Sequence, residues 1–102
     1  MQIKEIMTSD PACCTSDTPL EEVARLMVEN DCGEIPVVAN RDKNVVIGVV
    51  TDRDIVCRTL AKGLNPMGLA AESCMTTGIA TVTPEMSVED VCRTMEEFRI
   101  RR

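Results

Sequence analysis

The chain has 102 residues, a formal charge of −6, 44% hydrophobic and 27% charged residues, which suits one compact unit of ordinary globular composition. Phe98 is its single aromatic residue, and an acidic chain without stacking rings argues against generic nucleic-acid binding. No stretch has the pattern of a signal peptide or the length of a membrane span. We therefore expect a cytoplasmic protein that binds neither membranes nor nucleic acid.

The first predicted helix begins at Thr18-Pro19-Leu20-Glu21, with Thr18 as its cap, Pro19 at the first helical position and Glu21 three residues after the cap. An apolar stripe follows at helical spacing. It comprises Leu20, Val23, Ala24, Met27 and Val28. Gly33 suits the left-handed position that ends a helix.

Two short apolar segments, residues 35–38 and 45–51, are predicted to be buried strands covered on both faces. A polar turn at residues 40–44 separates them. Thr51-Asp52-Arg53-Asp54 opens a further helix that is expected to run to about Ala61, and a linker follows. Together with a short strand before the first helix, the predicted order is β-α-β-β-α.

The chain repeats itself at a shift of 68 positions, which aligns Met7-Thr8 with Met75-Thr76. Matching pairs at this shift include Thr15 and Thr83, Glu21 and Glu89, Val23 and Val91, Arg25 and Arg93, Met27 and Met95. In the second copy, Ser87 is predicted to cap a helix whose stripe is Val88, Val91, Cys92 and Met95.

Arg102 aligns with Glu34, so the second copy is expected to be incomplete. The predicted domains are a first repeat at 1–63, a linker at 64–74 and the first half of a second repeat at 75–102. Because the exposed second-copy helix face would lack cover, we expect the chain to pair with another copy or to continue.

The six cysteines lie at positions 13, 14, 32, 57, 74 and 92, without a Cys-x-x-Cys pair and without any histidine in the chain. Zinc sites require closely spaced Cys or His pairs, and a catalytic thiolate requires a base. We interpret the cysteines as reduced core residues. No metal site, required cofactor or enzymatic activity is expected.

The stretch Ile35-Pro36-Val37-Val38, followed by Gly48-Val49-Val50-Thr51-Asp52-Arg53-Asp54-Ile55, resembles the CBS domain, named for cystathionine β-synthase. The resemblance implies an α/β (α+β) fold of tandem β-α-β-β-α repeats, the second incomplete here. Such pairs form a Bateman module that commonly binds adenine ligands in the cleft between repeats.

Carried over to this chain, the resemblance implies that Thr51 lies near phosphates and that Asp54 accepts hydrogen bonds from ribose hydroxyls. The implied ligand is AMP, ADP, ATP or S-adenosylmethionine. The full set of implied nucleotide-binding residues is Thr51, Arg53, Asp54, Thr76, Ile79, Ala80, Ile100 and Arg101. A second site would need the region of Thr8, Ala12, Gly33 and Glu34 and a second Thr-x-x-Asp, which the chain lacks.

Two interpretations of Thr51 and Asp54 remain open, because Thr-x-x-Asp at a helix start is also an ordinary capping box. The leading function is a regulatory module that senses an adenine nucleotide and forms a homodimer. The alternative is a structural dimerisation module with no small ligand.

Overall fold

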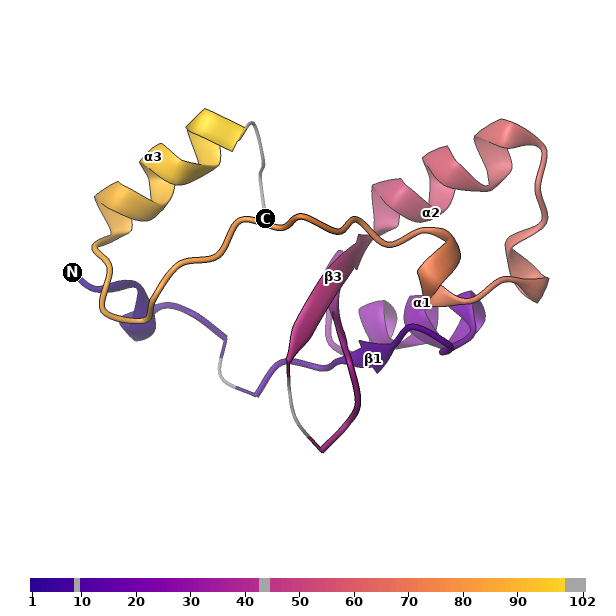
Figure 1. The fold of residues 1–102 in the computed structure, drawn as a ribbon, viewed down its shortest axis with the longest axis horizontal. Helices are drawn as coiled ribbons and strands as arrows, with labels where there is room; N and C mark the ends of the chain where they lie inside the picture. Colours follow the sequence, from indigo (N-terminus) through magenta and orange to yellow (C-terminus); the bar gives the residue numbers. More distant parts are fainter. Residues whose placement is uncertain (9, 43–44, 99–102) are drawn as a thin grey trace. The chain divides into compact units, whose positions relative to one another are not determined.

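The computed structural model describes residues 1–8, 10–42 and 45–98, and it divides into two compact units (Figure 1). The large unit is Pro11–Ile79, and the small unit is Met1–Asp10 together with Ala80–Arg102. No helix within the described ranges combines the length and apolar character needed to cross a membrane.

The large unit contains a three-stranded sheet in the order β1-β2-β3, formed by Cys14–Thr15, Glu34–Val38 and Val46–Thr51. β1 pairs with β2 in parallel, and β2 pairs with β3 in antiparallel. With α1 (Leu20–Glu29) between β1 and β2, and α2 (Asp52–Arg58) after β3, the predicted β-α-β-β-α order of the first repeat is confirmed.

α1 begins one residue later than predicted, and Thr18 does not cap it. The Thr18 hydroxyl instead accepts a hydrogen bond from the Thr15 N–H at 3.0 Å, in the turn that follows β1. The first N–H of the helix, that of Leu20, donates to the Leu69 carbonyl at 2.9 Å. The first N–H of α1 is therefore paired by a distant backbone segment, and not by the local cap predicted from the sequence.

The buried face of α1 differs from the predicted stripe. Leu20, Val23 and Met27 are buried as predicted, but Val28 is 81% exposed and Ala24 is also exposed. Leu26, outside the predicted stripe, packs against the core. The prediction for Ala24 and Val28 was wrong because helical spacing leaves the rotation of the helix about its axis open by one side-chain position.

The left-handed residue that ends α1 is Asp31, at φ 48°, and not Gly33 as predicted. The Asp31 N–H donates to the Val28 carbonyl at 3.3 Å, and the Cys32 N–H donates to the Met27 carbonyl at 3.0 Å. This pair of bonds is the Schellman arrangement, in which a left-handed residue lets the chain fold back on the last turn. Asp tolerates that conformation better than most side chains.

The core of the large unit joins the sheet, α1 and a segment after α2. Its buried members are Cys14, Leu20, Val23, Met27, Ile35, Val37, Val50, Ala71 and Cys74. The last two come from residues 64–74, the predicted linker, where the 3₁₀ turns Pro66–Gly68 and Ala71–Ser73 lie. α2 ends three residues before the predicted Ala61 and is followed by a 3₁₀ turn at Leu60–Lys62.

Two burial predictions are wrong. The first half of β3 is exposed, with Val46 at 44% and Ile47 at 37%, so the expected cover on both faces does not extend along the whole strand. All six cysteines are free thiols, but only Cys14 and Cys74 are buried; the exposed ones are Cys32, Cys57 and Cys92. Residue type alone does not decide which side of an element a thiol occupies.

The small unit holds α3 (Val88–Phe98), which begins 68 positions after α1. The Ser87 hydroxyl accepts the Asp90 N–H at 3.1 Å, as the predicted cap requires. In the predicted stripe of this helix, Val91 is buried, but Cys92 is exposed and the prediction was wrong there. Ala24, at the aligned position of α1, is exposed as well.

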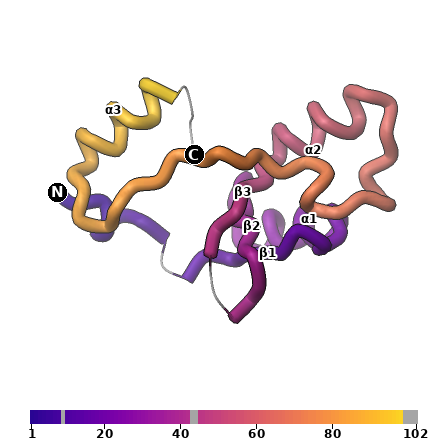
Figure 2. The backbone as a smooth tube through the Cα atoms, in the orientation of Figure 1, coloured from indigo at the N-terminus to yellow at the C-terminus, as the bar shows by residue number. Residues whose placement is uncertain are grey.

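The N-terminal residues pair with the segment that leads into α3, inside the same unit (Figure 2). The Ile3 N–H donates to the Met86 carbonyl at 2.7 Å, and the Val88 N–H donates to the Met1 carbonyl at 3.0 Å. The start of the chain thus provides an acceptor for the first turn of α3.

Candidate functional site

The site is built on the junction between β3 and α2, where the strand ends and the helix starts at once. The Thr51 hydroxyl accepts the Asp54 N–H at 3.0 Å, and the Asp54 Oδ2 atom accepts the Thr51 N–H at 3.0 Å. These reciprocal bonds form a capping box. They fix the Asp54 side chain, which is only 17% exposed, at the first turn of α2.

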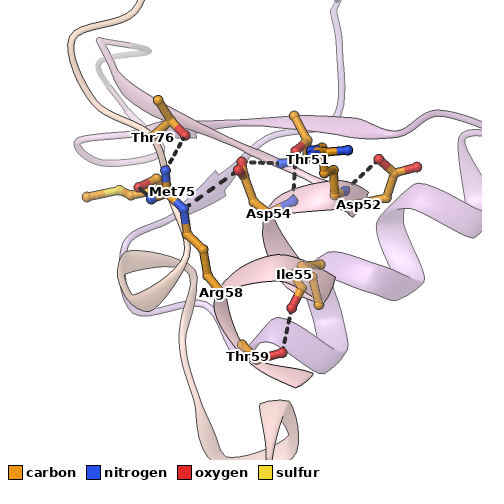
Figure 3. Close-up of polar contacts among 9 residues, drawn as sticks. Thr51, Asp52, Asp54, Ile55, Arg58, Thr59, Met75 and Thr76 are labelled. Carbon is orange, nitrogen blue, oxygen red and sulfur yellow. Dashed lines mark hydrogen bonds and ion pairs between the residues drawn. The ribbon is translucent and has the colours of Figure 1, made fainter. Parts of the chain in front are cut away.

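Arg58 follows Asp54 by one helical turn and connects α2 to residues 75–76 (Figure 3). Its Nε atom lies 3.8 Å from the Asp54 Oδ1 atom. Its two terminal nitrogens donate to the Met75 carbonyl at 3.0 Å and to the Thr76 hydroxyl at 3.3 Å. One guanidinium therefore contacts both the helix carboxylate and Thr76.

Gly48 lets the same segment lie against β3. Val49 and Thr76 exchange two backbone hydrogen bonds, at 3.0 and 2.8 Å, and thereby form an antiparallel bridge at the edge of the sheet. A Cβ at position 48 would lie 2.8 Å from the Thr76 carbonyl oxygen, closer than carbon and oxygen pack. Position 48 must therefore be glycine for Thr76 to lie this close to β3 and, through it, next to α2.

The buried thiols near the sheet are held in their neutral form. Burial raises the pKa of the Cys74 thiol, and the negative charge of Asp54 raises it further. Burial, with a smaller contribution from Cys13, raises the pKa of Cys14 to about 11. Neither thiol is suited to act as a nucleophile at neutral pH.

The side chains gathered at the junction are hydrogen-bonding groups. Among the residues that the structure describes, no three His, Cys, Asp or Glu side chains gather as a metal site would require. The side chains at the junction include the Asp52 and Asp54 carboxylates, the Arg58 guanidinium and the hydroxyls of Thr51 and Thr76, groups that recognise alcohols and anions.

The structure brings together three of the sequence-predicted site residues, Thr51, Asp54 and Thr76, in the large unit. Arg53 is exposed on α2, and Ile79 is half-buried at the end of the large unit. Ala80 belongs to the small unit, and Ile100 and Arg101 lie outside the described residues.

Two residues of the proposed second site lie beside the same junction. The Gly33 carbonyl accepts the Asp52 N–H at 2.9 Å, and Glu34 pairs with Thr51 in the sheet. Ala12 is in the large unit and Thr8 in the small one. The sequence interpretation missed Arg58, although its position four residues after Asp54 on a predicted helix was a usable signal for an ion pair.

A profile described as the CBS domain matches residues 3–58 and 71–102. The chain belongs to the CBS domain family. The predicted resemblance, and with it the fold of tandem CBS repeats, is confirmed. The two matched ranges correspond to the two copies that the 68-residue shift aligns.

Named CBS relatives include the CBS domain-containing protein YhcV of Bacillus subtilis, 36% identical over 100 residues, which are 98% of this chain and 69% of the relative. An uncharacterized conserved protein from Pyrococcus horikoshii has a similar solved structure, with a TM-score of 0.85, 34% identity, and coverage of 97% of this chain and 73% of that one. The CBS domain protein PAE2072 of Pyrobaculum aerophilum, solved in complex with AMP, shares the fold at a TM-score of 0.86 and 23% identity, over 99% and 75% of the two chains.

Proposed function

We propose that this chain is a ligand-sensing regulatory CBS module that binds an adenine ribonucleotide, with Asp54 accepting hydrogen bonds from the ribose hydroxyls. The observation that carries the proposal is the unused hydrogen-bonding capacity of the Asp54 carboxylate. Oδ2 accepts the Thr51 N–H, whereas within the described part of the large unit Oδ1 accepts no hydrogen bond and has the Arg58 Nε atom at 3.8 Å, which exceeds hydrogen-bonding distance. An ionised carboxylate accepts about four hydrogen bonds, so capacity remains for a cis-diol.

The capping box and the ligand site are therefore compatible uses of the same residue. The cap occupies one lone pair of Oδ2 and holds the carboxylate rigid, which reduces the entropy that a ligand must offset on binding. The CBS protein PAE2072 binds AMP, which makes AMP the first ligand to test here. In our proposal the ligand acts by binding one arrangement of the repeats more tightly than another, without chemistry on the ligand.

We further propose that the repeats span 1–63 and 75–102, joined by 64–74, and that the protein is cytoplasmic and works as a homodimer. The family resemblance supports the proposal that Thr76, Ile79, Ala80, Ile100 and Arg101 hold the base, and Arg53 is proposed as a further nucleotide-binding residue. The proposed ligand set remains AMP, ADP, ATP and S-adenosylmethionine.

The alternative function, a dimerisation module without a small ligand, has a specific observation in its favour. Four large apolar side chains on α2 and the turns after it are at least half exposed: Val56, Leu60, Leu64 and Met67. All four lie within residues 56–67, and contiguous exposed apolar surface is typical of interaction sites.

Isothermal titration calorimetry separates the two functions. We expect Asp54→Asn, which retains the cap and removes the charge, to weaken AMP binding by about tenfold to a hundredfold, because a hydrogen bond to a charged group is worth about 1.5–3 kcal/mol. A 2′-deoxy ligand should show a loss of similar size with the unmodified protein.

Asp90→Asn is the matched control, since Asp90 has the same position after its capping residue Ser87 on α3. It should bind AMP as the unmodified protein does. The absence of heat with any of the four ligands, in a protein that light scattering finds dimeric, would favour the dimerisation module. Equal affinities of Asp54→Asn and Asp90→Asn would remove Asp54 from the site.

A further inference from the structure

Arg58 determines the direction of the hydrogen bonds around Thr76. A guanidinium has five N–H donors and no acceptor, so each oxygen in contact with it must accept. The Thr76 hydroxyl accepts from Arg58 at 3.3 Å, which directs its own proton away from α2. Within the described residues of the large unit, 11–42 and 45–79, no side chain or backbone group accepts that proton. The half-buried Thr76 is thus prepared to donate to a ligand.

Asp54 presents the opposite polarity at the other side of the same guanidinium. It is an acceptor, held by the Thr51 N–H at Oδ2 and facing the Arg58 Nε atom with Oδ1. Arg58 contacts Asp54 within α2 and Thr76 outside it, and its bond to the Met75 carbonyl fixes the backbone just before Thr76. Among the residues drawn in Figure 3, Arg58 alone contacts both Asp54 and Thr76.

We infer that Arg58 is a positioning residue that presents Asp54 and Thr76 together, as one acceptor and one donor, to a single ligand. The inference rests on the proposed function and adds the hydrogen-bond pattern that the ligand must carry. The ligand needs a hydroxyl that donates to Asp54 and an acceptor atom, such as a ring nitrogen or a carbonyl or phosphate oxygen, that faces Thr76. A ribonucleoside ligand meets both conditions.

The first experiment compares AMP affinities by calorimetry in the full chain. We expect Arg58→Met, which keeps a long unbranched stem without donors, and Thr76→Val each to weaken binding about tenfold. Because Arg58 acts through Thr76, the double variant should lose far less than the roughly hundredfold that independent effects would give. Arg58→Lys, which keeps the charge and a single donor nitrogen, should restore part of the affinity.

Arg25→Met is the matched control, since Arg25 forms an i,i+4 pair with Glu21 on α1, as Arg58 does with Asp54 on α2. It should bind AMP normally. If Arg58→Met binds AMP as Arg25→Met does, or if the losses of Arg58→Met and Thr76→Val multiply, the positioning role is wrong.

The second experiment needs no ligand, so it separates this inference from the proposed function. The Thr76 N–H donates to the Val49 carbonyl at 2.8 Å, and its hydrogen exchange reports opening of the segment. We expect Arg58→Met to accelerate that exchange about tenfold and to leave the Val23 amide of α1 unchanged. Should the protein bind no adenine nucleotide, the proposed function fails, while accelerated Thr76 exchange still supports the hold of Arg58 on Thr76. Unchanged exchange overturns the inference whether or not a nucleotide binds.

Discussion

Gly48→Ala should displace residues 75–76 from β3, because the added Cβ would lie 2.8 Å from the Thr76 carbonyl oxygen and 3.3 Å from the Met75 Sδ atom. The first neighbour is backbone and cannot rotate away, so the two Val49–Thr76 hydrogen bonds must lengthen or break. Each is worth about 0.5–1.5 kcal/mol, so we expect a loss of about 1–3 kcal/mol in the free energy of unfolding. Overpacking costs of about 1–3 kcal/mol are of the same size.

Thermal and urea unfolding measure this loss, and about 1 kcal/mol corresponds to a fall in Tm of roughly 4–8 °C for a domain of this size. Gly68→Ala is the control, since nothing lies within 4 Å of a Cβ built there. It should be neutral or slightly stabilising, because alanine reduces the freedom of the unfolded chain. If Gly48→Ala unfolds at the same temperature as Gly68→Ala, the steric account of Gly48 is wrong.

Three further predictions concern the large unit. Leu20→Ala should lower the free energy of unfolding by about 2–5 kcal/mol, because Leu20 is buried. Val28→Ala, at an 81% exposed position, should change it by less than about 0.5 kcal/mol. Urea titration of both variants tests the observed rotation of α1. Asp31→Gly should raise the Tm, because the left-handed conformation costs a non-glycine residue about 1 kcal/mol, and an unchanged or lower Tm would show that the Asp31 side chain contributes more than strain. The pKa of the Cys14 thiol is raised from 9.0 to about 11, so between these pH values the folded state keeps a proton that the unfolded state loses. The free energy of unfolding should therefore fall as the pH rises from about 9 to about 11. In the same denaturant titrations, Cys14→Ala should show a smaller fall.

Local signals in the sequence were sufficient for the elements that carry the candidate site. The alternation of apolar segments and polar turns placed β2 and β3, and Thr51 with Asp54 predicted the capping box that the structure contains. Both partners of that box lie within four residues of each other, so its geometry depends on the helix start alone. The same reasoning held for Ser87 and Asp90 on α3.

The repeat was also visible without a structure, since α1 and α3 begin 68 positions apart. Sequence alone therefore determined the family, the order of the elements in the first repeat and the identity of Thr51 and Asp54 as candidates. These features depend on residues close together in the chain or on copies of one pattern.

Only the tertiary structure decided that Thr76 lies beside the junction of β3 and α2. Arg58 contacts Thr76 across 18 positions of sequence, and Gly48 is needed because the same distant segment lies on β3. The rotation of α1 about its axis and the hydrogen bond of the Leu20 N–H likewise depend on partners outside the helix. Such contacts leave no periodic trace in a sequence, because each depends on where two separate segments pack and not on the spacing within either one.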